Sequence, residues 1–154
     1  MVSQIGYQLR RVDLISMEAL SEELAKLGVA PGRATALSFI HLNPGSDQAA
    51  LGRVLGINAA STMAAVNGLV ALGAVERRPG RDRRSNALHL TDQGRRLHDE
   101  VVELIDQHNT NFFAALTPDE SAELFRLLVK VRASHSTAAR SASSTTRAIL
   151  RRVK

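Results

Sequence analysis

The chain has 154 residues, of which 44% are hydrophobic and 3% aromatic, and it contains no cysteine and no tryptophan. This length fits one domain with an aliphatic core, and the missing cysteines exclude disulfides, thiolate metal sites and thiol switches. No apolar run approaches the ~18 residues of a membrane span, and the start lacks the pattern of a signal peptide. The sequence therefore predicts a cytoplasmic protein with no membrane segment.

The net charge of +5 is unevenly placed along the chain. All 15 acidic residues precede residue 134, and the excess of positive charge lies behind it, in Arg140, Arg147, Arg151, Arg152 and Lys154. A second concentration lies between Arg77 and Arg84, where five arginines are opposed only by Asp82. Localised basic patches are typical of nucleic-acid binders, although charge alone fits a solvated basic face equally well.

The first half of the chain has the periodicity of helices. Apolar side chains recur at helical spacing over residues 4–27, and Gly28 ends this long amphipathic helix. Pro31 is suited to the first turn of a second helix, which extends to about residue 41, because proline there loses no hydrogen bond. Asn43-Pro44-Gly45 is a strong stop signal.

Two short helices follow, joined by a tight turn that contains glycine. The first covers residues 47–55, with Ser46 or Asp47 as its cap, and Asn58 caps the second, at about 59–72. This is the pattern of a helix-turn-helix unit, whose second helix would enter the major groove of DNA. The side chains expected to face inward from the first helix and the turn are Ala50, Leu51, Val54, Leu55 and Ile57.

A β-hairpin is predicted next, from strands at 74–78 and 87–90 with turn residues at 79–82 between them. Its tip carries arginines that can reach a phosphate or a narrow minor groove. Thr91 then caps a long helix that extends to about residue 115. The last helix begins at Thr117-Pro118-Asp119-Glu120, a capping box, and the segment from residue 134 either extends it or forms a basic tail.

In their order and spacing, these motifs resemble the multiple antibiotic resistance regulator (MarR) family of bacterial regulators over about residues 4–133. The segments that carry the resemblance are Gly6-Tyr7-Gln8-Leu9-Arg10-Arg11, Leu51 to Gly56, Leu69 to Val75 and Leu116-Thr117-Pro118-Asp119-Glu120. The most specific is Asp82-Arg83-Arg84 followed by Leu88-His89-Leu90-Thr91 and Gly94, which matches the family's wing.

The resemblance implies a mainly α fold with a small β-hairpin wing, in a single MarR-like domain over residues 1–154. A winged helix-turn-helix at about 31–95 is then flanked by dimerisation helices at 4–27 and 92–150. The implied function is sequence-specific binding of double-stranded DNA by a homodimer on a pseudo-palindromic operator. The resemblance also implies that the protein is a cytoplasmic repressor. A small ligand would lower its affinity for DNA.

The predicted reading helix departs from the family pattern because it carries no charge. The family often has basic residues where this chain has Ala59, Ala64 and Gly68, so arginine-to-guanine readout from this helix is absent. Gly68 either allows a close backbone approach or is neutral. We therefore expect the wing to carry much of the affinity, and the candidate DNA contacts are Arg83, Arg84, Arg81, Ser61, Thr62, Asn67 and Arg53.

Each of these candidates also has a structural interpretation. Arg83 or Arg84 can pair with Asp82 to stiffen the hairpin, and Thr62 can be buried against the preceding helix. The resemblance also implies an effector pocket for an aromatic or anionic ligand, between the dimerisation helices and the winged domain. Its candidate lining residues, for which ordinary packing is the alternative, are Arg11, His41, Tyr7, Met17, Phe39, His108 and Phe112.

Other classes of function have little support in the sequence. The five histidines show no metal-ligand spacing, and we find no nucleophile elbow, phosphate loop or dinucleotide fingerprint. We therefore expect no metal, no cofactor and no enzymatic activity. A winged domain that binds a protein partner is the alternative of another class, and the arginine-rich wing argues against it.

Overall fold

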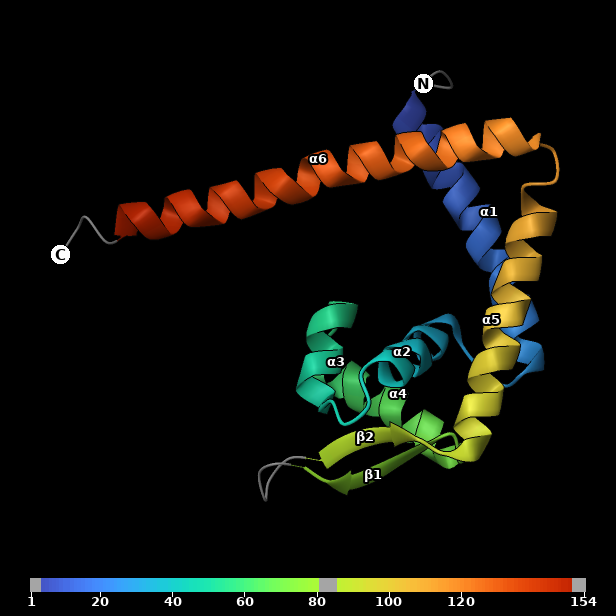
Figure 1. Ribbon diagram of the computed structural model, residues 1–154, viewed down its shortest axis with the longest axis vertical. Coiled ribbons are helices and arrows are strands. Elements are labelled where there is room, and N and C mark those ends of the chain that lie inside the picture. Colours follow the sequence, from blue (N-terminus) through green and yellow to red (C-terminus); the bar gives the residue numbers. More distant parts are fainter. Residues whose placement is uncertain (1–3, 81–85, 151–154) are drawn as a thin grey trace. The chain divides into compact units, whose positions relative to one another are not determined.

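The computed structural model describes residues 4–80 and 86–150, with side chains as far as residue 135. The chain divides into two compact units, Met1–Thr110 and Asn111–Lys154. The first contains α1 (Ile5–Lys26), α2 (Pro31–Leu42), α3 (Gln48–Leu55), α4 (Ala59–Ala71), β1 (Val75–Pro79), β2 (Asn86–Leu90) and most of α5 (Asp92–Phe112) (Figure 1). The second contains the end of α5 and α6 (Pro118–Leu150). This element order confirms the predicted mainly α fold with a hairpin.

The two helices of the helix-turn-helix begin where the sequence predicts. The Asp47 carboxylate accepts a hydrogen bond from the Ala50 amide at 2.6 Å, so Asp47 caps α3. The Asn58 side chain accepts one from the Ser61 amide at 2.8 Å and caps α4 in the same way. Gly56 lies between them at a φ of 65°, a left-handed conformation that glycine adopts without steric cost.

The core of the first unit is aliphatic, as the composition predicts. Leu37 and Ile40 of α2, Leu51 of α3, Leu69 of α4 and Leu88 of β2 are completely inaccessible to solvent. Each such leucine contributes roughly 1.5–3 kcal/mol through its removal from water. Together they hold α2, α3, α4 and the hairpin around one centre (Figure 1).

The predicted inner face of α3 is wrong at its edge. Val54 is 65% exposed and Ile57, in the following turn, is 40% exposed. The reason is that α3 packs through Leu51 and Gly52, and Gly52 lies so close to α4 that an added Cβ would be 2.7 Å from the Thr62 hydroxyl. This contact rotates the buried stripe of α3 away from Val54.

The hairpin is antiparallel and pairs Val75 with Leu90 and Arg77 with Leu88. On the other side of β2, Leu88 also bonds to the loop before α3. Its carbonyl accepts from the Gly45 amide and its amide donates to the Ser46 carbonyl, both at 2.9 Å. The sequence predicted a stop at this loop but not this pairing, which ties the hairpin to the start of the helix-turn-helix.

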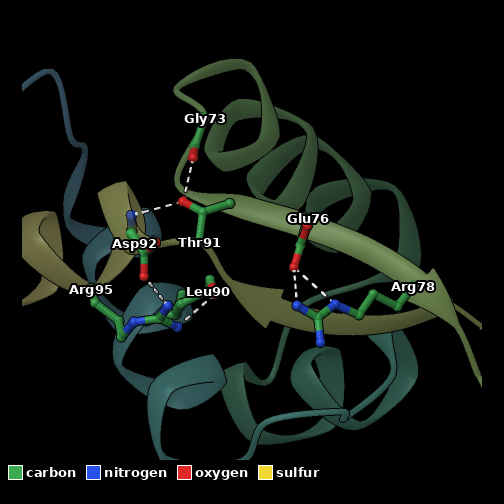
Figure 2. Close-up of polar contacts among 8 residues, drawn as sticks. Gly73, Glu76, Arg78, Leu90, Thr91, Asp92 and Arg95 are labelled. Carbon is green, nitrogen blue, oxygen red and sulfur yellow. Dashed lines mark hydrogen bonds and ion pairs between the residues drawn. The ribbon is translucent and has the colours of Figure 1, made fainter.

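The start of α5 is joined to the root of the hairpin through Thr91 (Figure 2). The Thr91 hydroxyl donates to the Gly73 carbonyl at 2.6 Å and accepts from the Gly94 amide at 2.9 Å, which confirms the predicted cap. At Gly94, an added Cβ would lie 1.9 Å from the Ala74 carbonyl oxygen. Glycine is therefore required at this position, where α5 approaches the backbone that leads into β1.

The second unit confirms the predicted capping box at the start of α6. The Thr117 amide donates to the Glu120 carboxylate at 2.8 Å, and the Glu120 amide donates to the Thr117 hydroxyl at 3.3 Å. The Thr117 hydroxyl also donates to the Glu120 carboxylate, at 2.9 Å, and the bonds from the Thr117 amide and hydroxyl lower the pKa of Glu120. Of the two alternatives for the segment after residue 134, the structure has the helical one as far as Leu150.

Within the described parts of the chain, no single helix is long and apolar enough to span a membrane, although α3 and α4 together meet the criterion of length and composition across a 112° bend.

We predict that Gly94→Ala destabilises the protein by about 3 kcal/mol or more, because the new methyl group meets a backbone oxygen that cannot rotate away. Urea unfolding measures the change in the free energy of unfolding. Gly32→Ala, in the first turn of α2, is the control because its Cβ would meet no atom within 4 Å. Equal stability of the two variants would contradict the close approach at Gly94.

We also predict that the capping box of α6 weakens in acid. Because its pKa is lowered in the folded state, Glu120 contributes stability above the ordinary glutamate pKa, and this contribution is lost as the pH falls through the lowered value. Thermal unfolding of the wild type and of Glu120→Gln should therefore differ at neutral pH and converge at low pH. A difference that does not change with pH would show that the charge has no role.

Candidate nucleic-acid interface

The exposed face of α4 is the candidate reading surface. Between Ala59 and Ala71 this helix has no charged residue, and Ser61, Met63, Ala64 and Asn67 are exposed. Met63 is 52% exposed although it is a large apolar side chain in a well-packed unit. Such a face can contact thymine methyl groups and can donate few hydrogen bonds.

The expected base contact by Thr62 is contradicted by its burial. Thr62 is 2% exposed, and its hydroxyl donates to the Asn58 carbonyl at 2.9 Å. The side chain faces Gly52 of α3, so it cannot reach the edge of a base. The alternative interpretation, packing of Thr62 against α3, is the one that the structure favours.

Asn67 lies on the exposed face, as predicted, but it has a partner that the sequence interpretation missed. The Arg77 guanidinium, from β1, donates a hydrogen bond to the Asn67 side-chain oxygen at 2.6 Å. The signal was available in the alternation of the strand, which places Arg77 on the same side as the buried Val75. A positive charge is therefore held at the surface of a helix that has none of its own.

A second arginine lies against α4 from α2. A Cβ added to Gly68 would come within 2.5 Å of the Arg33 guanidinium, so Gly68 makes room for this group. The group that approaches Gly68 is the end of a flexible side chain and not a backbone, so this contact does not decide between the two interpretations of Gly68. Arg33 also lines a surface hollow of about 550 Å³, together with Val54, Leu55, Ile57, Ser61, Ala64 and other residues of α2 and α4.

Four arginines of the wing and α3 are candidates for contacts with DNA, and Arg53 is the one that lies within the described residues. Arg53 is exposed on α3 and lines a hollow of about 630 Å³ with Gln48, Gly56 and Ala59. Arg81, Arg83 and Arg84 lie outside the described residues. The contacts of these four arginines with DNA stay predictions.

Two separate sets of polar contacts lie at the hairpin, one on β1 and one at the start of α5 (Figure 2). The Arg78 guanidinium donates to the Glu76 carboxylate at 2.8 Å through Nε. At the start of α5, Arg95 pairs with Asp92 and donates to the Leu90 carbonyl at 3.0 Å, and the bond from Arg95 lowers the pKa of Asp92. These pairs lie at the root and the outer face of the hairpin, away from the Arg77 side of β1.

The expected effector residues are spread over several elements. Tyr7, Arg11 and Met17 are exposed on α1, and Phe39 of α2 packs on the core. Within the first unit, the His41 ring stacks on the His98 ring of α5 with centroids 4.0 Å apart, and His108 lies 3.1 Å from the Ser16 hydroxyl. Phe112 belongs to the second unit, where it meets Phe113 edge to face. The two hollows on the winged unit are lined by other residues, so the effector site stays a prediction.

For metal ions, residues 4–80 and 86–135 contain no group of three or more His, Asp or Glu side chains arranged to hold one.

A helix-turn-helix with an exposed second helix and a hairpin beside it defines a winged helix-turn-helix, a DNA-binding class. A sequence profile described as the MarR family matches residues 27–85. A protein of Thauera aromatica, named as a transcriptional regulator proposed for the hcr operon, is 28% identical over 133 residues, which cover 85% of this chain and 80% of that protein.

Solved structures agree with this classification. The transcriptional repressor CouR bound to a 23-mer DNA duplex is 27% identical with a TM-score of 0.76, over 85% of this chain and 94% of that chain. A MarR family protein of Mycobacterium tuberculosis in complex with DNA is 26% identical with a TM-score of 0.75, over 84% and 98% of the two chains. The latter protein is also solved with p-aminosalicylic acid, with a TM-score of 0.70. In sequence over residues 27–85 and in fold over most of its length, the chain is similar to transcriptional regulators of the MarR family.

We predict that Gly68→Ala leaves the free energy of unfolding unchanged or raises it by up to about 1 kcal/mol. Alanine favours the helix, and the atoms that its Cβ meets are the far end of the flexible Arg33 side chain. The matched control is Gly52→Ala, whose Cβ meets the buried Thr62 hydroxyl and should cost about 1–3 kcal/mol. Chemical denaturation compares the two, and a large loss in Gly68→Ala would show that Arg33 cannot move.

Proposed function

We propose that this regulator is a repressor, which binds a pseudo-palindromic operator as a homodimer and releases it when a small ligand binds. The observation that supports DNA binding most directly is the exposed face of α4, which is uncharged itself but has Arg77 hydrogen-bonded to its Asn67. The DNA complexes of the two related regulators support the same role. A regulator of this kind would act in the cytoplasm, where the chromosome lies.

The homodimer is supported by apolar side chains that each unit leaves exposed. On α1 these include Ile5, Leu14 and Ile15, which are 79%, 46% and 51% exposed. On α6, Phe125 is 71% and Val131 is 56% exposed. We propose that a second copy of the chain covers these apolar faces, and that residues 4–27 and 92–150 are the dimerisation helices. The winged helix-turn-helix would then lie between them, at about residues 31–95. A two-fold dimer would present two reading helices about one duplex turn apart.

For the dimer, we predict that Phe125→Asp converts the protein to a monomer with much weaker DNA binding, because a charge would be buried in the interface. Sedimentation velocity gives the mass, and an unchanged dimer would contradict the role of this face. Arg126→Ala is the control, since its partner Glu123 is exposed on the same helix and the pair contributes little.

For DNA binding, we predict that the double variant Arg83→Ala/Arg84→Ala binds DNA more weakly. The slope of log affinity against log salt concentration should become shallower by about one to two, about one for each lost phosphate contact. The probe is the DNA flanking the gene of this protein, on which a footprint should first show two inverted half-sites. Arg10→Ala/Lys26→Ala is the control, because it removes the same charge from exposed ion pairs of α1. An unchanged affinity and salt slope would contradict a contact by the wing.

The proposed ligand is an aromatic carboxylate or a related anion. The candidate site includes Arg11, Tyr7, Met17, Phe39, His41, His108 and Phe112, and the support is the relative solved with p-aminosalicylic acid. Binding would shift the population of the dimer from a DNA-binding state to one in which the winged units are spaced differently. Titration of the protein–DNA complex with p-aminosalicylate should release the DNA in the wild type and less so in Arg11→Ala.

A further inference from the structure

We propose that Arg77 of β1 is a specificity-determining residue that reads a guanine in the major groove, and that Asn67 is the residue that positions it. This inference rests on the proposed DNA-binding function and assigns to β1 a role that the reading helix lacks. The observation that carries it is the 2.6 Å hydrogen bond from the Arg77 guanidinium to the Asn67 side-chain oxygen.

The direction of the Arg77 side chain follows from the register of the hairpin. Arg77 pairs with Leu88, which is completely buried, and it lies two residues from the buried Val75. Successive side chains of a strand point to opposite faces, so Arg77 shares the face of the hairpin that packs on the helices. The long side chain starts at the middle of β1 and extends beyond the core, and its guanidinium bonds to Asn67 on the exposed face of α4.

The hydrogen bond changes what each of the two side chains can recognise. An asparagine reads adenine through its oxygen and its NH₂ group together, and here the oxygen of Asn67 already accepts from Arg77. Arginine has five N–H donors in a planar fork, of which this bond uses one. A guanidinium held at one corner loses less conformational entropy on binding and can still present two parallel donors to O6 and N7 of guanine.

The neighbouring residue Arg78 provides a matched control within the same strand. It points to the opposite face of the hairpin, and its guanidinium is bonded to the Glu76 carboxylate at 2.8 Å (Figure 2). Arg77→Ala and Arg78→Ala therefore remove the same charge at adjacent positions, but only the first removes a group from the surface of α4.

The test begins with duplexes selected by the full-length wild type from a randomised DNA library. Fluorescence anisotropy then gives the affinity of each variant for the best duplex and for its single base-pair replacements. We expect one G·C pair in each half-site at which replacement weakens the wild type about 10- to 100-fold. At this pair, Arg77→Ala should no longer discriminate, Arg77→Lys should discriminate poorly, and Arg78→Ala should resemble the wild type.

Asn67→Ala separates positioning from folding, because Asn67 is exposed and its removal leaves the core intact. We expect this variant to keep its melting temperature and lose part of the discrimination at the same base pair. The proposal is overturned if Arg77→Ala and Asn67→Ala retain the wild-type base preferences, or if Arg77→Ala weakens all duplexes equally. A wild type that selects no duplex would instead refute the proposed DNA-binding function itself.

Discussion

The close approach of α5 to the chain between α4 and β1 is the constraint on which the winged unit depends. Gly94 lies so near the Ala74 carbonyl that no side chain fits between them, and Thr91 bonds to both Gly73 and Gly94. Gln93 adds a bond to the Leu72 carbonyl at 2.9 Å. Two stretches of the chain, residues 72–74 and 91–94, are thereby held together, which sets the direction in which the hairpin leaves α4. Because β1 starts at this point, the reach of Arg77 to Asn67 depends on it.

The charges beside the reading helix are carried by other elements of the winged unit. The helix expected to read the bases has no charged residue, and two guanidinium groups that lie against it come from β1 and α2. Gly68 of α4 leaves space for the Arg33 guanidinium. The adjacent Asn67 accepts a hydrogen bond from Arg77. Because neighbouring elements carry the charges, the exposed side chains of the helix itself can be small or apolar. Its exposed surface can then approach thymine methyl groups closely.

The exposed ion pairs have a smaller role. Those of α1 and α6 join residues three apart on one helix, and their side chains are about half exposed or more. Pairs of this kind stabilise a protein by at most about 1 kcal/mol. The folded unit is instead stabilised by its aliphatic core, while the apolar faces of α1 and α6 are suited to association.

The sequence by itself determined the order of the elements and the ends of the helices, because these depend on local chemistry. Asp47, Asn58, Thr91 and Thr117 each act as the predicted cap, since a cap needs only a backbone amide two or three residues away. The family resemblance likewise depended on such local motifs. Packing between elements was predicted less well: Val54 and Ile57 are exposed and Thr62 is buried, because the Gly52 contact sets how α3 faces α4.

Only the tertiary structure decided which polar groups meet. Asn67 and Arg77 are ten residues apart, and Gly45 and Leu88 more than forty. The alternation of β1 places Arg77 on the side of the buried Val75, but only the packing of the hairpin decides that it meets Asn67. Arg33 and Gly68 are brought together in the same way by the packing of α2 on α4. The sequence thus determined that the chain is a winged DNA-binding protein with an uncharged reading helix. The fold decided which charges lie beside that helix, because such contacts depend on how distant segments pack.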